Sequence, residues 1–159
     1  MQHTLFILLL TKNQIDELKK ISIKALPNEA VALGFGVIEK KDNLELNNLK
    51  TQFLYYIIKI IEEFQSSHPS PIYFLLDDVE LLYKKWMNAQ KKGLKLICIF
   101  HSHPSGCVPS GVDKDYMKNI SIVYPFIIWL IYGNTSDKFQ AYLYNNNKIS
   151  EVKMIIKND

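Results

Sequence analysis

The feature that most constrains the fold is an apolar run from Leu94 to Phe100, broken only by Lys95. A short run of this kind, rich in β-type residues, is typical of a strand that is buried on both faces near the middle of a sheet. Helical patterns lie before and after it, so we expect an α/β domain. The run leads directly into His101, which brings a polar side chain to the end of a buried strand.

The length and composition indicate a single globular domain and argue against several other classes of protein. The 159 residues fit a single domain, 1–159, that can fold around its own core. The 19 basic and 16 acidic residues are scattered, which argues against nucleic-acid binding. The apolar run at residues 5–10 is too short to span a membrane, and no export signal accompanies it. Two cysteines, Cys98 and Cys107, indicate a reducing cytoplasm, so we expect a cytoplasmic protein without nucleic-acid or membrane partners.

The N-terminal half combines helical and β-type patterns. Thr11 and Gln14 form a capping box that opens a helix at about 12–25, and Pro27 ends it. Residues 49–65 fit either a strand or a helix. The remaining predicted elements of this half are strands at 5–10 and 30–38, a turn at 40–43, and a strand from Leu44 onward.

The C-terminal half continues the alternation. Asp77 or Asp78 caps a helix that ends near Gly93. Residues 148–156 fit either a strand or a final helix. The other predicted elements are a loop at 66–71, a strand at 72–76, a short helix at about 111–119, and strands at 122–132 and 139–144.

Residues 101–113 carry the chemistry. His101 and His103 lie two positions apart at a strand end, so their imidazoles point to the same side. Asp113 follows after a loop and can add a carboxylate oxygen. Two histidines and one carboxylate leave a fourth position open, which is the pattern of a catalytic zinc site. Ser110 and Asp113 also form a helix N-cap signature, and a capped helix start can hold a ligand.

The run His101-Ser-His-Pro104 followed by Ser110-Gly-Val-Asp113 resembles the JAMM motif of the MPN+ (Mov34-type) zinc metalloproteases. Pro27-Asn-Glu29 resembles the upstream glutamate of that family. The resemblance covers roughly residues 12–38 and 72–145. It implies a single-domain member of prokaryotic type with the MPN/JAMM (cytidine-deaminase-like) fold, a mixed β-sheet flanked by helices.

The chain departs from the family motif in one respect. Six residues separate His103 from Ser110, where the family pattern has seven. The usual spacing would place Gly111 and Lys114 at the serine and aspartate positions, where neither side chain can act. We therefore place the shortening in the loop before Ser110 and keep Asp115 as a reserve carboxylate. Cys107, in the same loop, is interpreted as a loop residue and not as a ligand.

The resemblance also implies a mechanism. His101, His103 and Asp113 would hold Zn²⁺, Glu29 would act as general base and then acid, and Ser110 would donate a hydrogen bond to the oxyanion. Ser102 points to the opposite strand face and is expected to be structural. The implied activity is a zinc-dependent isopeptidase that cleaves ubiquitin-like proteins from their conjugates, with the substrate tail docking near residues 50–70.

Three alternatives share the motif or the fold. The first is a peptidase that processes the C-terminus of a sulfur-carrier ubiquitin-like protein. The second is a non-catalytic MPN scaffold, although all the ligands are present here. The third is a DNA-repair-associated relative of the RadC group, which typically has Asn where this chain has Ser102. The oligomeric state is not indicated by the sequence.

Overall fold

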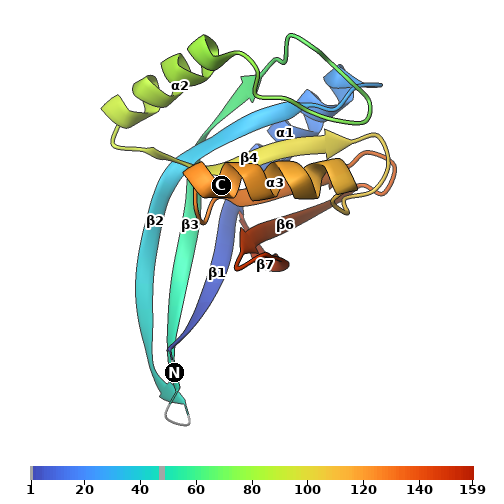
Figure 1. The fold of residues 1–159 in the computed structure, drawn as a ribbon. Helices are drawn as coiled ribbons and strands as arrows, with labels where there is room; N and C mark the ends of the chain where they lie inside the picture. Colours follow the sequence, from blue (N-terminus) through green and yellow to red (C-terminus); the bar gives the residue numbers. More distant parts are fainter. Residues whose placement is uncertain (1, 47–48) are drawn as a thin grey trace.

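The computed structural model describes residues 2–46 and 49–159, which form seven strands and three helices (Figure 1). The helices are α1 (Lys12–Ala25), α2 (Val79–Lys91) and α3 (Gly111–Val123). The strands are β1 (Gln2–Thr11), β2 (Val31–Leu46), β3 (Leu49–Phe64), β4 (Lys95–His103), β5 (Ile128–Gly133), β6 (Lys138–Asn145) and β7 (Lys148–Lys157).

The strands form one sheet of mixed direction, as predicted, in the order β1-β3-β2-β4-β5-β6-β7. The β1–β3, β1–β7 and β4–β5 pairs are parallel, and the other pairs are antiparallel. The sheet closes into a barrel because β1 pairs with β3 on one side and with β7 on the other. The prediction of a mixed β-sheet flanked by helices did not include this closure. The relation to cytidine deaminases stays a prediction.

Two apolar clusters hold the helices against the sheet. One joins α1, through Leu18 and Ile21, to one face of the strands. The other joins α2 and α3, through Ala89 and Met117, to the opposite face. Phe100 of β4 belongs to the first cluster and its neighbour Ile99 belongs to the second. The prediction that β4 is a central strand buried on both faces is confirmed, because all its residues from Ile97 onward are buried.

The capping predictions are confirmed. Thr11 Oγ1 accepts from the Gln14 backbone N–H at 3.2 Å, and Gln14 Oε1 accepts from the Thr11 N–H at 3.0 Å. Asp78 caps α2, because its Oδ1 accepts from the Leu81 N–H at 2.9 Å. Gly93 follows that helix with φ +72°, a left-handed conformation that glycine adopts without strain.

Three element predictions are wrong. The turn predicted at 40–43 lies inside β2, since the β2–β3 ladder continues to Leu46 and Leu49; residues 47 and 48 lie outside the described residues. Residues 72–76 form no strand, because the segment crosses the second apolar cluster and buries Phe74 there. Residues 122 and 123 belong to the last turn of α3, so the strand predicted from 122 begins only at Ile128.

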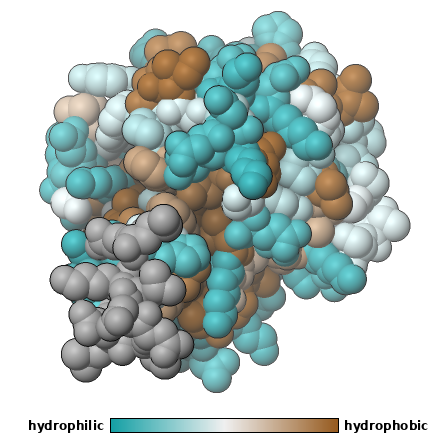
Figure 2. All heavy atoms as spheres, turned by 60° about the horizontal axis from the view of Figure 1, so that its bottom comes forward, coloured by the Kyte–Doolittle hydropathy of each residue, from teal (hydrophilic) through white to brown (hydrophobic). Residues whose placement is uncertain are grey.

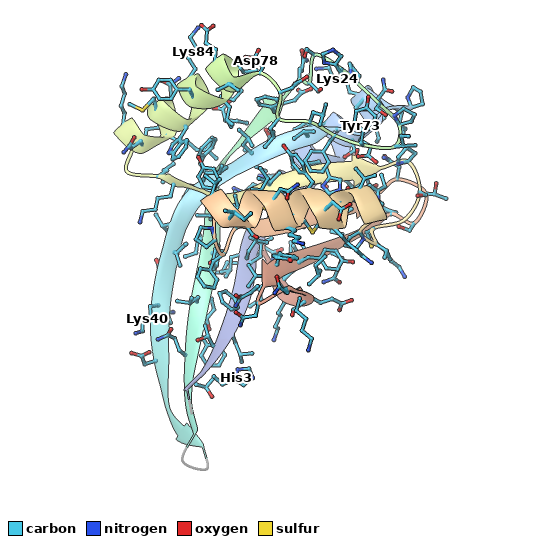
Figure 3. The ribbon with its side chains drawn as sticks, in the orientation of Figure 1. His3, Lys24, Lys40, Tyr73, Asp78 and Lys84 are labelled. Carbon is cyan, nitrogen blue, oxygen red and sulfur yellow. The ribbon has the colours of Figure 1, made fainter. Side chains whose placement is uncertain are left out.

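The two open assignments are resolved as strands, since residues 49–64 form β3 and residues 148–157 form β7. Within the described ranges, no helix has both the length and the apolar character that crossing a membrane requires. The β2–β3 hairpin and the start of β1 extend below the body as an arm, on which Figure 3 labels Lys40 and His3. Figure 2 shows hydrophobic residues at the surface on this lower side.

Candidate metal centre

The end of β4 places two imidazoles side by side. His101 and His103 project from the same face of the strand, because side chains alternate along it. His101 is fully buried and His103 is 7% exposed. Their Nε2 atoms lie 3.1 Å apart. The sequence prediction that both rings meet at the strand end is confirmed.

Asp113 reaches both histidines from the first turn of α3. Its Oδ1 lies 3.2 Å from Nε2 of His101, and its Oδ2 lies 3.1 Å from Nε2 of His103. The carboxylate is 1% exposed. It is fixed by the predicted capping box: the Ser110 N–H donates to Asp113 Oδ2 at 2.6 Å, and the Asp113 N–H donates to Ser110 Oγ at 3.1 Å. The shorter loop therefore still brings Asp113 to the histidines.

Glu29 approaches from the segment between α1 and β2. Its Oε1 lies 3.9 Å from Nε2 of His103, and its side chain is 5% exposed. Ligand atoms of Glu29, His101, His103 and Asp113 all lie within 4.8 Å of one another. Four residues that the sequence analysis selected from two distant parts of the chain thus form one cluster. Asp115 is exposed and lies outside it, as does Cys107.

Burial and the neighbouring charges shift the pKa values of the four side chains. Burial raises the pKa of Glu29 to about 7. Burial also lowers the pKa of His101, against the opposing effect of Asp113. For His103, burial lowers the pKa, but the hydrogen bond and charge of Asp113 outweigh it and the net shift is upward. Burial raises the pKa of Asp113, but its hydrogen bonds with both histidines hold that pKa well below its usual range.

The donor set fits zinc. A tetrahedral zinc with bonds of about 2.0–2.1 Å to nitrogen and oxygen has ligand atoms about 3.3 Å apart. The two Nε2 atoms lie 3.1 Å apart, and each lies close to its own oxygen of Asp113, His101 at 3.2 Å from Oδ1 and His103 at 3.1 Å from Oδ2. Two imidazoles and one carboxylate are also the ligand types of catalytic zinc sites. Glu29 lies farther from the histidines, with its Oε1 at 3.9 Å from Nε2 of His103.

His103 has an outer partner that the sequence did not reveal. Its Nδ1 lies 2.9 Å from the Gly106 carbonyl oxygen, to which an Nδ1–H can donate. That tautomer leaves Nε2 free to bind a cation, which is the usual arrangement behind a metal-binding histidine. The partner comes from the loop that the shorter motif creates.

The β5–β6 turn supports this loop. Asn134 donates to the His103 carbonyl from its backbone N–H at 2.9 Å and from Nδ2 at 3.0 Å. Thr135 Oγ1 donates to the Pro104 carbonyl at 2.7 Å. A Cβ on Gly133 would lie 2.5 Å from the Ser105 carbonyl oxygen, so the close approach of turn and loop requires glycine there. Sequence patterns could not reveal these contacts, because the partners lie some 30 residues apart.

The segment between β3 and α2 covers the other side of the site. The Phe74 ring stacks on His101 with centroids 4.2 Å apart and planes at 24°. Among the described residues, no hydrogen-bond partner reaches His101 Nδ1. The Ser70 carbonyl accepts from the Glu29 N–H at 2.8 Å. The sequence did not predict either the Phe74–His101 stack or the Glu29–Ser70 hydrogen bond, because residues 66–71 were expected to form a loop and residues 72–76 a strand.

A pocket of about 240 Å³ lies beside Glu29. Lys24 of α1 and Tyr73 of the segment before α2 line it, and Figure 3 shows both at the same end of the molecule. Residues 63, 65, 66 and 68–70 also line it, which places part of the predicted docking region, 50–70, next to the site. The pocket gives a ligand access to the Glu29 side of the cluster.

The chain is similar to several known proteins. The family model described as prokaryotic homologs of the JAB domain matches residues 11–144. A protein named desampylase, from Pyrococcus furiosus, is 38% identical over 90 residues, which make up 55% of this chain and 59% of that relative. The solution structure of a protein from Desulfitobacterium hafniense matches with a TM-score of 0.70 at 24% identity, over 96% of this chain and 94% of that one, which shows a shared fold. The resemblance to the JAMM/MPN+ group is thereby confirmed, and the chain belongs to the family of prokaryotic JAB-domain homologs.

Proposed function

We propose that this chain is a zinc-dependent isopeptidase that removes ubiquitin-like proteins from their conjugates. The observation that carries the proposal is the buried cluster of Glu29, His101, His103 and Asp113, whose ligand atoms lie within 4.8 Å of one another. Burying several ionisable side chains together is costly unless they are paired or bind a cation. Membership of the prokaryotic JAB family supports the same reaction class.

His101, His103 and Asp113 would hold the zinc. When bound there, zinc lowers the pKa of a water molecule to about 7 and polarises a carbonyl group. Glu29, with its pKa raised to about 7, is suited to accept a proton near neutral pH and to pass it to the leaving lysine amine. The oxygen of Ser110 already accepts the Asp113 N–H, so its hydroxyl hydrogen remains available for the oxyanion of the substrate.

A relative supports the proposed substrate class. The name desampylase denotes an enzyme that removes a ubiquitin-like modifier, and that protein shares 38% identity with 90 residues of this chain. We place the extended tail of such a modifier in the pocket beside Glu29, which residues 63–70 help to form. We further propose that the chain acts in the cytoplasm as one domain, without nucleic acid or a membrane.

Two forms of one substrate test the proposal. A sulfur-carrier-type ubiquitin-like protein is linked through its C-terminal carboxyl either to a lysine ε-amine in a fluorescent peptide or to the α-amine of the same peptide. Zinc-loaded protein is expected to cleave the ε-linked form faster, and His103→Ala is expected to bind no zinc and to cleave neither.

The alternatives predict other results. Cleavage of the α-linked form alone would show that the chain processes the C-terminus of a carrier protein. Stoichiometric zinc with no cleavage of either form would show a non-catalytic JAB domain. Tight DNA binding that weakens steeply with salt would instead favour the DNA-repair reading.

A further inference from the structure

The backbone on both sides of Glu29 is anchored. The Glu29 N–H donates to the Ser70 carbonyl at 2.8 Å, which fixes the peptide plane that precedes the residue. The Ala30 N–H donates to Ser102 Oγ at 2.9 Å, which fixes the plane that follows. Two fixed planes determine φ and ψ of Glu29, and therefore the direction of its Cα–Cβ bond.

The second anchor replaces a bond of the sheet. Val31 pairs with His101 in the antiparallel β2–β4 ladder, so Ala30 lies opposite Ser102. Such a pair can exchange two backbone hydrogen bonds. Here the Ser102 N–H donates to the Ala30 carbonyl at 3.0 Å, but the Ala30 N–H goes to the Ser102 side chain. The fully buried hydroxyl thus takes over the last ladder bond at the point where the chain leaves the sheet toward Glu29.

The carboxylate itself has little to hold it. Among the described residues, no hydrogen-bond donor reaches Glu29 Oε2, which is buried. The nearest cluster contact of Oε1 is His103 Nε2 at 3.9 Å, beyond hydrogen-bond range. The position of the carboxylate beside the histidines therefore depends on the backbone that carries it.

We propose that Ser102, which lies between the two histidines in sequence, is a positioning residue for Glu29 and acts through the Ala30 N–H. The inference rests on the proposed function, in which Glu29 moves the proton. The Ser102 side chain points away from His101 and His103, since side chains alternate along β4. Loss of its hydroxyl therefore displaces the base while leaving the zinc ligands in place.

The test compares Ser102→Ala, Ser102→Thr and Ser22→Ala. Ser22 is the matched control, because it is also fully buried and its hydroxyl donates to the Leu18 carbonyl within α1. For each variant, zinc affinity is measured by titration of the metal-free protein against a chromophoric chelator. Steady-state kinetics use the ε-linked fluorescent conjugate, and NMR follows hydrogen exchange at the Ala30 amide.

Ser102→Ala is expected to keep the zinc affinity and KM of the parent, to lower kcat by roughly 10–100-fold as the base is displaced, and to speed exchange at the Ala30 amide. Ser102→Thr retains a hydroxyl and should restore most of the lost turnover. Ser22→Ala should leave kcat and Ala30 exchange unchanged. In a Glu29→Gln background, Ser102→Ala should lower kcat no further, because the base that it positions is gone.

The outcomes separate this proposal from the one on which it rests. Parental kcat and parental Ala30 exchange in Ser102→Ala would overturn the positioning role, whatever Glu29 does. An equal fold-loss of kcat in the Glu29→Gln background would also overturn it, since Ser102 would then act independently of Glu29. If Glu29→Gln alone turns over like the parent, the general-base assignment fails instead, and fast Ala30 exchange in Ser102→Ala would still show the anchor.

Discussion

The carboxylate of Asp113 contributes both to the cap of α3 and to the buried cluster. Oδ2 accepts the Ser110 N–H and lies 3.1 Å from His103, while Oδ1 lies 3.2 Å from His101. Its pKa stays well below the usual range because contacts with both histidines outweigh the cost of burial. The residue is therefore ionised at neutral pH, as a metal ligand must be. Asp113 thus caps α3 through Oδ2 while both of its oxygens stay close to the imidazoles.

Glu29→Gln separates catalysis from metal binding. The amide keeps the size of the side chain but cannot accept the proton, while His101, His103 and Asp113 are untouched. We expect zinc stoichiometry near one, measured by elemental analysis, together with loss of most turnover on the ε-linked conjugate. Turnover close to that of the parent would reduce Glu29 to a buried carboxylate without a catalytic role.

Ser110→Ala tests two roles with different readouts. Loss of an N-cap costs about 1 kcal/mol of stability, so the melting temperature should fall by a few degrees. Loss of an oxyanion donor costs about a hundred- to a thousandfold in kcat. We expect both effects in calorimetry and steady-state kinetics. A lower melting temperature with parental kcat would show that Ser110 caps α3 but does not act in catalysis.

At the scale of elements, the site depends on contacts between segments that are far apart in the sequence. The loop after His103 supplies the Gly106 carbonyl for the histidine Nδ1, and the β5–β6 turn holds that loop through Asn134 and Thr135. The motif is one residue shorter than the family pattern, yet Asp113 still reaches both imidazoles. The hydrogen bonds of the turn fix the carbonyl groups of His103 and Pro104 in this loop.

Asn134→Ala should weaken zinc binding without removing a ligand. The variant loses the Nδ2 bond to the His103 carbonyl, so the loop and the His103 ring are less well fixed. Losses of outer contacts behind a metal ligand typically lower affinity by about 10–100-fold. Competition with a chromophoric chelator measures the effect. Ser136→Ala is the control, because its hydroxyl bonds within the same turn, to the Gly133 carbonyl; equal affinities in the two variants would contradict the prediction.

Short sequence patterns predicted the helices and strands whose positions depend on residues close together in the chain. The capping boxes at Thr11 and Ser110 marked the starts of α1 and α3, and the apolar run before His101 marked the central strand. The segment at 72–76 was mistaken for a strand because it is apolar; in the structure Phe74 stacks on His101, and Phe74 and Leu76 pack in the second apolar cluster. The turn at 40–43 was mistaken because polar residues there lie on an extended hairpin.

The site was more predictable than the fold around it. His101, His103 and Asp113 are close in the sequence, and their spacing alone places two of them on one face of a strand. Glu29 was selected only through its resemblance to the family motif. Closure of the barrel could not be predicted, since it depends on β1 pairing with both β3 and β7, elements up to about 150 residues away.

At the scale of the whole molecule, the cluster of Glu29, His101, His103 and Asp113 is not part of the two apolar clusters that form the core. Two apolar clusters on opposite faces of the sheet join all three helices to the strands. The proposed ligands sit at the end of β4 and at the start of α3, and without a metal their side chains can hydrogen-bond one another. The chain thus has a core of ordinary size that does not require zinc to form.

Removal of zinc by a chelator should therefore abolish cleavage while leaving the circular dichroism spectrum nearly unchanged. An ion that binds only the folded state stabilises it by mass action, by about 4 kcal/mol at a thousand times Kd. For a chain of this length, that corresponds to a fall in melting temperature of roughly 8–16 °C on chelation. Zinc added back should restore both melting temperature and activity. A structural zinc would behave differently, because its binding free energy is folding free energy and the metal-free chain is largely unfolded. Loss of the folded spectrum at room temperature on chelation would therefore contradict the catalytic assignment.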